Sequence, residues 1–164
     1  MLPSPATDKP PPRYRPCAGI LLVNRDGLIF IGERRGQAGN AWQMPQGGID
    51  RDEDPLLAAR RELLEETGIE RVELLAESAH WHCYDVPEDR RPAYWRGRYV
   101  GQCQRWFAFR FAGADDDIDL DGHAPEFSLW RWATPDEVLD LAVPFKRAVY
   151  AAVIEEFRPV LAGS

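Results

Sequence analysis

The feature that most constrains this chain is a helix with clear start and stop residues at positions 55–67. Asp54 is a residue type that caps helix N-termini, and Pro55 suits the first helical position because no amide hydrogen is needed there. Gly68 suits the left-handed conformation in which many helices end. Apolar residues recur at helical spacing along one face of the segment, at Leu56, Ala59 and Leu63. The sequence therefore predicts a helix that packs this face against the core.

The same predicted helix carries a concentration of negative charge. Glu62, Glu65 and Glu66 are three and four residues apart, so their carboxylates lie on one side of the helix. Like charges at this spacing repel by roughly a few tenths of a kcal/mol per pair. A divalent cation removes the repulsion, because oxygen ligands suit Mg²⁺ or Mn²⁺. Arg61 is placed to pair with Glu65 or with Glu53, and so to orient a carboxylate.

A solvated acidic helix face is the alternative explanation for these glutamates. The residues around the helix favour a site instead, because they form a long pattern at fixed spacing. In full, the pattern is Gly47-x5-Glu53-x7-Arg61-Glu62-Leu63-x-Glu65-Glu66-x-Gly68-Ile69. It fits the signature of the Nudix hydrolases at every fixed position, and the chain resembles that family. Asp52 stands where a glycine is common in the family, which affects the turn and removes no predicted ligand.

The resemblance implies a fold, a cofactor and a reaction. The Nudix fold is a mixed β-sheet sandwiched between helices, with a loop–helix–loop that holds a divalent metal ion. In this chain the metal ligands would be the carbonyl of Gly47 and the carboxylates of Glu62, Glu65 and Glu66. The reaction would be attack of water on a phosphoanhydride, with the metal activating water and neutralising oxygen charge. Either Glu62 or Glu66 would accept the proton as general base, and Arg61 completes the predicted catalytic group.

Segments outside the signature narrow the resemblance to one branch of the family. That branch contains the bacterial RNA pyrophosphohydrolases and the related bacterial and plant dinucleoside tetraphosphate hydrolases. The matching segments lie between residues 14 and 157: Tyr14-Arg15-Pro16, the run 42–48, the run 95–102, Pro125-Glu126-Phe127, and Phe145-Lys146-Arg147.

The branch resemblance implies further site residues. Glu126 would reach the metal from outside the signature. Phe145 would stack on a base and Lys146 would contact phosphate, as aromatic and basic residues do on single strands. Arginine side chains suited to phosphate oxygens and one tyrosine complete the predicted pocket: Arg15, Arg34 and Tyr84. The alternatives are a core position for Phe145 and plain surface positions for the charged residues.

The rest of the chain predicts strands around two helices. Apolar or alternating runs indicate strands at residues 17–23, 28–31, 72–81, 104–112 and 127–133. The turn residues at 24–27 join the first two runs into a hairpin. Thr134-Pro135-Asp136-Glu137 is a capping box, and a helical pattern from Phe145 to Phe157 closes the domain. This order gives an α+β fold with α/β/α layers.

Size and charge exclude several classes of protein. With 164 residues the chain suits one domain, which we expect at residues 14–164 after a flexible, proline-rich lead-in at residues 1–13. No apolar run is long enough to span a bilayer, so a membrane protein is not expected. A net charge of −7 is a poor match to a broad surface for duplex DNA, whereas phosphates held through metal ions are compatible with it. The sequence identifies no protein partner.

The cysteines bear on the cellular compartment. Cys17, Cys83 and Cys103 are an odd number without close paired spacing. This pattern argues against a disulfide framework and predicts a protein of the reducing cytoplasm.

Three functions remain open at this point. The first is an RNA pyrophosphohydrolase that converts the 5′-triphosphate end of RNA into a monophosphate. The second is a hydrolase that splits diadenosine tetraphosphate asymmetrically into ATP and AMP. The third, more distant, is a binding module for nucleotides or RNA ends without catalysis, which is disfavoured because every carboxylate of the signature is present.

Overall fold

The computed structural model describes residues 9–36, 42–122 and 125–161. Most of the predicted flexible lead-in, residues 1–8, therefore lies outside the described residues. Within the described ranges the strands are β1 (Tyr14–Val23), β2 (Ile29–Arg34), β3 (Trp42–Gln43), β4 (Gln46–Gly48), β5 (Val72–Glu77), β6 (His82–Asp85), β7 (Gly101–Phe111) and β8 (Phe127–Ala133). The helices are α1 (Pro55–Thr67), α2 (Pro135–Leu141) and α3 (Pro144–Leu161), with single 3-10 turns at Glu88–Arg90, Ala93–Trp95 and Asp115–Asp117.

The centre of the sheet is a long parallel pair of strands. β1 and β7 run side by side from Tyr14 opposite Gly101 to Val23 opposite Arg110. The strand order is β3-β2-β1-β7-β5, while β4 pairs with β1, β6 with β7 and β8 with β2. All pairs other than β1–β7 are antiparallel, so the sheet is mixed. Most of β1 and β7 is buried, as expected for strands covered on both faces.

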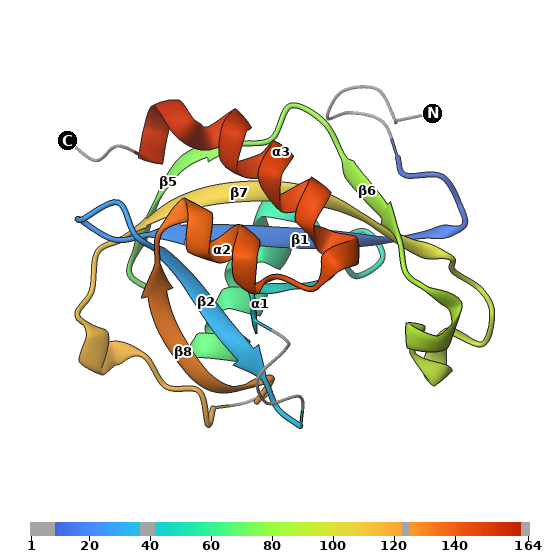
Figure 1. Ribbon diagram of the computed structural model, residues 1–164, viewed down its shortest axis with the longest axis horizontal. Coiled ribbons are helices and arrows are strands. Elements are labelled where there is room, and N and C mark those ends of the chain that lie inside the picture. The colour runs from blue at the N-terminus through green and yellow to red at the C-terminus, as the bar shows by residue number, and fades with distance from the viewer. Residues whose placement is uncertain (1–8, 37–41, 123–124, 162–164) are drawn as a thin grey trace.

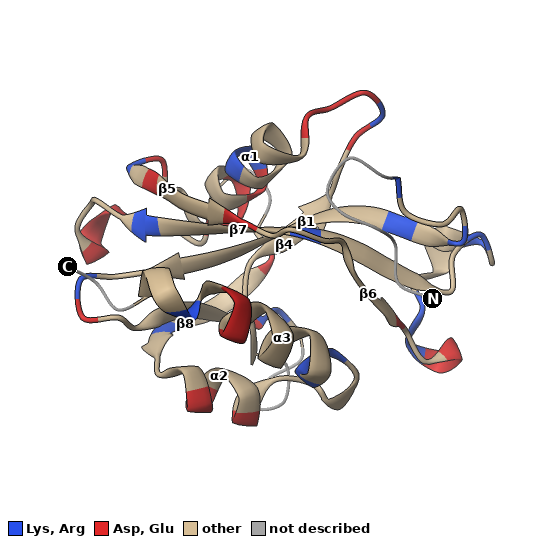
Figure 2. Ribbon diagram, turned by 90° about the horizontal axis from the view of Figure 1, so that it is seen from above, with Lys and Arg blue, Asp and Glu red and all other residues tan. Residues whose placement is uncertain are grey.

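Helices cover both faces of the sheet. Figure 2 shows α1 on one side of the strands and α2 with α3 on the other, and Figure 1 shows α2 and α3 crossing in front of β1 and β7. One apolar core lies on the side of α1, around Leu63, Phe107 and Phe127. A second lies under α3, around Trp106 and Tyr150. The predicted α+β fold with a mixed sheet between helices is confirmed.

Helix α1 forms where its end residues predicted it. The side chain of Asp54 accepts hydrogen bonds from the amides of Leu56 and Leu57, at 3.1 and 3.2 Å. Gly68 ends the helix in the left-handed region at φ 72°. Asp52, in the turn before the helix, also has a positive φ of 65°, which a glycine would adopt without strain. Asp52 thus stands in a left-handed turn position, a conformation that glycine favours.

The prediction of one strand at residues 72–81 is wrong for residues 78–81. β5 ends at Glu77, because Ser78 closes the pairing onto β7. The Ser78 amide donates to the Trp106 carbonyl at 2.8 Å, and the Trp106 amide donates to the Ser78 hydroxyl at 3.0 Å. The chain then restarts as β6, which pairs with the opposite end of β7, from His82 opposite Gln104. Two short strands therefore share one long neighbour, a division that apolar alternation does not reveal.

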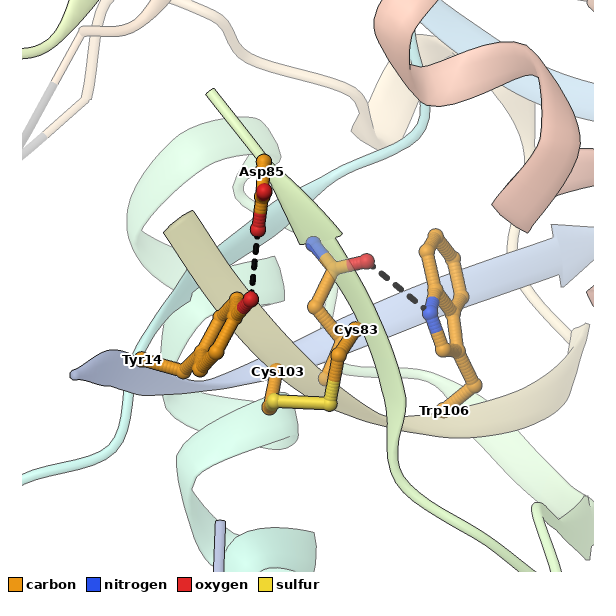
Figure 3. Close-up of a disulfide and its surroundings, with 6 residues drawn as sticks. Tyr14, Cys83, Asp85, Cys103 and Trp106 are labelled. Atoms are coloured by element: carbon orange, nitrogen blue, oxygen red, sulfur yellow. Dashed lines mark hydrogen bonds between the residues drawn. A yellow bond between two sulfur atoms is a disulfide. The ribbon is translucent and has the colours of Figure 1, made fainter. Parts of the chain in front are cut away.

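The expectation of unpaired cysteines is also wrong. Cys83 and Cys103 face each other in the β6–β7 register and form a disulfide bond (Figure 3). Their separation of 20 residues gives no hint of pairing, because the register of two strands brings them together. Cys17 is free and buried. The bond lies next to the hydrogen bond from the Tyr14 hydroxyl to Asp85, so this end of β6 is tied to both β7 and β1.

None of the helices in the described part of the chain is long and apolar enough to cross a bilayer.

We expect the disulfide to stabilise the fold by closing the 83–103 loop in the unfolded chain. Replacing both residues, Cys83→Ser with Cys103→Ser, should lower the free energy of unfolding by about 3 kcal/mol. Denaturant titration of the oxidised protein and the double variant measures this. The free energy of unfolding of the wild type in dithiothreitol should approach that of the variant. A variant as stable as the oxidised wild type would contradict the stabilising role of the bond.

Candidate active site

A cavity of about 250 Å³ opens where β4 meets α1. Every predicted site residue except Arg61 and Glu65 lines this cavity. Its lining includes Arg15, Arg34, Gly47, Glu62, Glu66, Tyr84, Glu126, Phe145 and Lys146 from that set, with Gln43, Gln46, Gly48, Val86, Arg90, Pro92, Tyr94, Trp95, Gln102 and Val143. The parallel pair β1–β7 forms its base, since Arg15 and Gln102 lie opposite each other there.

Two glutamates make the acidic end of the cavity. Glu66 is only 4% exposed, and its Oε1 has no hydrogen-bond partner among the described residues. Burial, followed by the charges of Glu62 and Glu126, holds the pKa of Glu66 well above its usual value. Burial also raises the pKa of Glu62, which shares a hydrogen bond with Glu66. A Cβ at position 47 would collide with the carboxylate of Glu62, so only glycine lets the β4 backbone come this close.

Arg61 holds the acidic loop against helix α1. Its Nε and Nη2 donate to the two oxygens of Glu53, both at 2.9 Å, and Nη2 also donates to the Gly48 carbonyl at 2.9 Å. Nη1 donates to Glu62 at 2.9 Å and lies 3.4 Å from Glu65. The hydrogen bond from Arg61 is the largest cause of the lowered pKa of Glu53. Both pairings expected from sequence, with Glu53 and with Glu65, are present.

Cationic side chains line the cavity beside the acidic pair. Lys146 is buried and donates from Nζ to the Gln43 side chain at 3.0 Å. Burial, and then the nearby charge of Arg34, lower the pKa of Lys146 to about 8. Arg34 lies 3.5 Å from the carboxylate of Glu126, with each side chain 41% exposed. Arg15 enters from β1 and packs against Gly48, where a Cβ would strike its guanidinium.

Aromatic rings form another wall of the cavity. The rings of Tyr84 and Phe145 are 6.0 Å apart at an interplanar angle of 35°. The Tyr84 hydroxyl donates to Gln102 at 2.6 Å, across the β6–β7 pair next to the disulfide. The Arg90 guanidinium lies 5.7 Å from the centre of the Phe145 ring. Phe145 also packs against the core under α3.

A sequence model of the NUDIX domain matches residues 13–153. The chain belongs to the Nudix family. A protein named RNA pyrophosphohydrolase from Cereibacter sphaeroides is 52% identical over 151 residues, which cover 91% of this chain and 93% of that protein. Its namesake from Novosphingobium aromaticivorans is 53% identical over 152 residues, covering 90% and 94%, and that from Rickettsia africae is 47% identical over 148, covering 90% and 92%. The expected family and branch are confirmed.

Solved structures show the same fold at low sequence identity. The Caenorhabditis elegans Ap4A hydrolase in a binary complex matches with a TM-score of 0.67 at 20% identity, covering 92% of this chain and 99% of its own. The Escherichia coli dihydroneopterin triphosphate pyrophosphohydrolase matches with a TM-score of 0.64 at 16% identity, covering 87% and 97%. Both therefore support the Nudix fold described above.

Some of the residues of the Nudix signature are arranged to hold a divalent cation, and one is not. The unpartnered Oε1 of Glu66 and the adjacent Glu62 carboxylate are hard oxygen donors that line the cavity together with Gly47. In the described residues, no three acidic, histidine or cysteine side chains are already grouped for an ion. Glu65 pairs with Arg61 at 3.4 Å and does not line the cavity. To bind a metal ion, Glu65 would have to give up its ion pair with Arg61.

Glutamines are among the site residues that sequence analysis missed in this Nudix chain, together with Arg90 and Tyr94. Gln43 holds the Lys146 ammonium, Gln102 holds the Tyr84 hydroxyl, and Gln46 accepts a hydrogen bond from Gln104 at 3.0 Å. Each stands at a buried or half-buried strand position, where an apolar residue is expected. A polar residue within a buried strand was the signal that could have indicated a site residue. Its hydrogen-bond partner, however, depends on tertiary contacts.

We expect Arg61→Lys to loosen the loop, because an ammonium cannot reproduce the two-pronged contact with Glu53. Unfolding free energy should fall by about 1–3 kcal/mol, the value of hydrogen bonds to charged groups, and turnover should fall about 10- to 100-fold. Denaturant titration and steady-state kinetics measure the two effects. Arg71→Lys, at an exposed arginine just beyond the same helix, is the matched control, and equal effects in both variants would remove Arg61 from its positioning role.

The lowered pKa of Lys146 predicts a pH dependence of substrate binding. Because this pKa is about 8, the ammonium is present below that pH and is lost above it. KM for a triphosphate substrate should therefore rise between pH 7 and pH 9 in the wild type. In Lys146→Met the KM should be high at both values, with a flatter profile. Parallel profiles in the two proteins would show that Lys146 does not contact the phosphates.

Proposed function

We propose that this protein is a metal-dependent RNA pyrophosphohydrolase that converts 5′-triphosphate ends of RNA into 5′-monophosphates. One observation carries the proposal: a single cavity joins the Glu62–Glu66 carboxylates to cationic side chains and to the Tyr84–Phe145 rings. A terminal nucleotide needs all three environments, for the reacting phosphorus, the phosphate charge and the base. The bacterial relatives with about half of their residues identical carry that name.

The acidic residues take the catalytic part in this proposal. The Gly47 carbonyl and the carboxylates of Glu62, Glu65, Glu66 and Glu126 would hold Mg²⁺ or Mn²⁺. When bound, the metal would supply neutralisation of charge on phosphate oxygens and activation of water. Either Glu62 or Glu66 takes the proton as water attacks phosphorus and the bridge to the leaving pyrophosphate breaks.

The remaining residues hold the substrate. Arg15, Arg34 and Lys146 contact the phosphate chain, because they line the cavity beside the acidic pair. Phe145 stacks on the first base, with Tyr84 held behind it by Gln102. Arg61 lies outside the cavity and acts by positioning Glu53 and Glu62.

Asymmetric hydrolysis of diadenosine tetraphosphate is the second candidate. The observation in its favour is Tyr94, which lies at the cavity with 68% of its surface exposed and offers a ring for a second base. The chemistry of the metal site is the same for both substrates. A binding module without catalysis is not supported, because the full set of signature carboxylates is present.

We place this activity in the cytoplasm, where new RNA 5′ ends are made. The cysteine content no longer supports that location, because Cys83 and Cys103 are bonded. Duplex DNA is not proposed as a substrate of a chain with a net charge of −7.

The proposal is tested by comparing kcat/KM for a 5′-triphosphorylated RNA octamer and for diadenosine tetraphosphate, in Mg²⁺. We expect the RNA to be preferred, with monophosphorylated RNA and pyrophosphate as products. Glu62→Gln should lower turnover at least about 100-fold, whereas the matched control Glu70→Gln, an exposed glutamate just beyond α1, should not. A preference for the dinucleotide by orders of magnitude would replace the first function by the second.

A further inference from the structure

A second cavity of about 660 Å³ adjoins the first. Its lining consists of Arg15, Tyr94, Trp95, Arg96, Arg98 and Tyr99. Three of these residues, Arg15, Tyr94 and Trp95, also line the first cavity, so the two are continuous. Figure 1 shows the segment between β6 and β7, which carries most of this lining, projecting beyond the end of the sheet. Of this lining, the proposed reaction uses Arg15 alone.

The segment is locally basic in an acidic protein. Residues 90–98 contain four arginines and no acidic residue, whereas the whole chain has a net charge of −7. Glu88 and Asp89 precede the segment, but neither lines either cavity. In the described part of the chain, Arg96 and Arg98 are exposed and form no ion pair with a carboxylate, in contrast to Arg35, Arg131 and Arg158. Their charges are therefore available to a ligand.

Aromatic rings alternate with these arginines. Tyr94 is 68% exposed, and the Arg15 guanidinium lies 6.0 Å from the centre of its ring. Tyr99 packs edge-on against the buried Trp95 at 5.7 Å, and the Arg98 guanidinium lies 5.8 Å from the Tyr99 ring. The exposed Tyr94 ring and the half-buried Tyr99 ring, beside arginines without a carboxylate partner in the described ranges, suit single-stranded nucleic acid, since rings stack on bases while guanidinium groups bind phosphates.

We propose that this second cavity binds the single-stranded RNA chain that follows the 5′-terminal nucleotides. The inference rests on the proposed function, which puts the 5′ end in the first cavity. The chain then leaves past Arg15 and Tyr94, the residues common to both linings, and its backbone continues over Arg96 and Arg98. Tyr94 stacks on a base of this downstream part. A dinucleotide ends before this surface, whereas a longer RNA covers it.

The matching experiment measures binding without turnover. RNA dinucleotides and octamers with a 5′-monophosphate and a 3′ fluorophore have no anhydride to cleave, so anisotropy titration in Mg²⁺ gives their dissociation constants. The test variant is Arg96→Gln with Arg98→Gln, which removes two charges and leaves a polar side chain at each position. The matched control is Arg25→Gln with Arg71→Gln, two exposed arginines at the opposite end of β1 and β7.

We expect the wild type to bind the octamer at least about tenfold more tightly than the dinucleotide, because stacking and phosphate contacts each add affinity. The Arg96–Arg98 variant should lose this difference and bind the dinucleotide as the wild type does, which also shows that it is folded. Its salt dependence for the octamer, the slope of log K against log salt concentration, should be shallower by about 1.4, for two lost phosphate contacts. The control should match the wild type in both respects.

Two results would overturn the inference: a wild type that does not distinguish the two lengths, or a control that loses as much affinity as the test variant. Turnover of the 5′-triphosphorylated octamer by the wild type is measured in parallel. Absent turnover with intact length-dependent binding would reject the proposed function and still support the RNA surface. Normal turnover without length-dependent binding would reject the surface alone.

Discussion

One guanidinium group connects the loop before α1 to the helix itself. Arg61 reaches both oxygens of Glu53, the Gly48 carbonyl and the carboxylate of Glu62. Its planar, fixed donors suit such a set of acceptors better than an ammonium would. The contact with Gly48 fixes the strand β4 beside α1, and this puts Gly47 against Glu62. Without that positive charge, the acidic side chains would repel one another and the loop would not close.

The site is built from groups that do not favour folding by themselves. Glu66 is buried with an unpartnered oxygen, and Lys146 is buried with its pKa lowered to about 8. Burying such groups is unfavourable, since both lose solvation as ions. The rigid frame that keeps them in place is the parallel pair β1–β7, with apolar cores on both faces and the disulfide at the edge of the cavity. Perturbed groups of this kind are common in catalytic sites.

Helix α1 and the acidic cluster could be predicted from sequence, whereas the break between β5 and β6, the disulfide and the glutamines could not. The residues of α1 act within a few positions of one another: the cap Asp54, the final Gly68 and the glutamates one turn apart. The pairing of Cys83 with Cys103, and of Gln43 with Lys146, depends on strand register and on how α3 packs. Such contacts join residues up to 103 positions apart, and no local pattern records them.

The sequence by itself determined the helix, its cluster of glutamates and the family, because helical spacing and end residues are local properties. The tertiary structure decided where those carboxylates point. It turned Glu65 toward Arg61, placed Glu62 and Glu66 in the cavity, and brought Phe145 and Tyr84 to the same wall. It also made the two cavities continuous through Arg15 and Tyr94, since β1 and the segment after β6 meet only when β7 pairs with both.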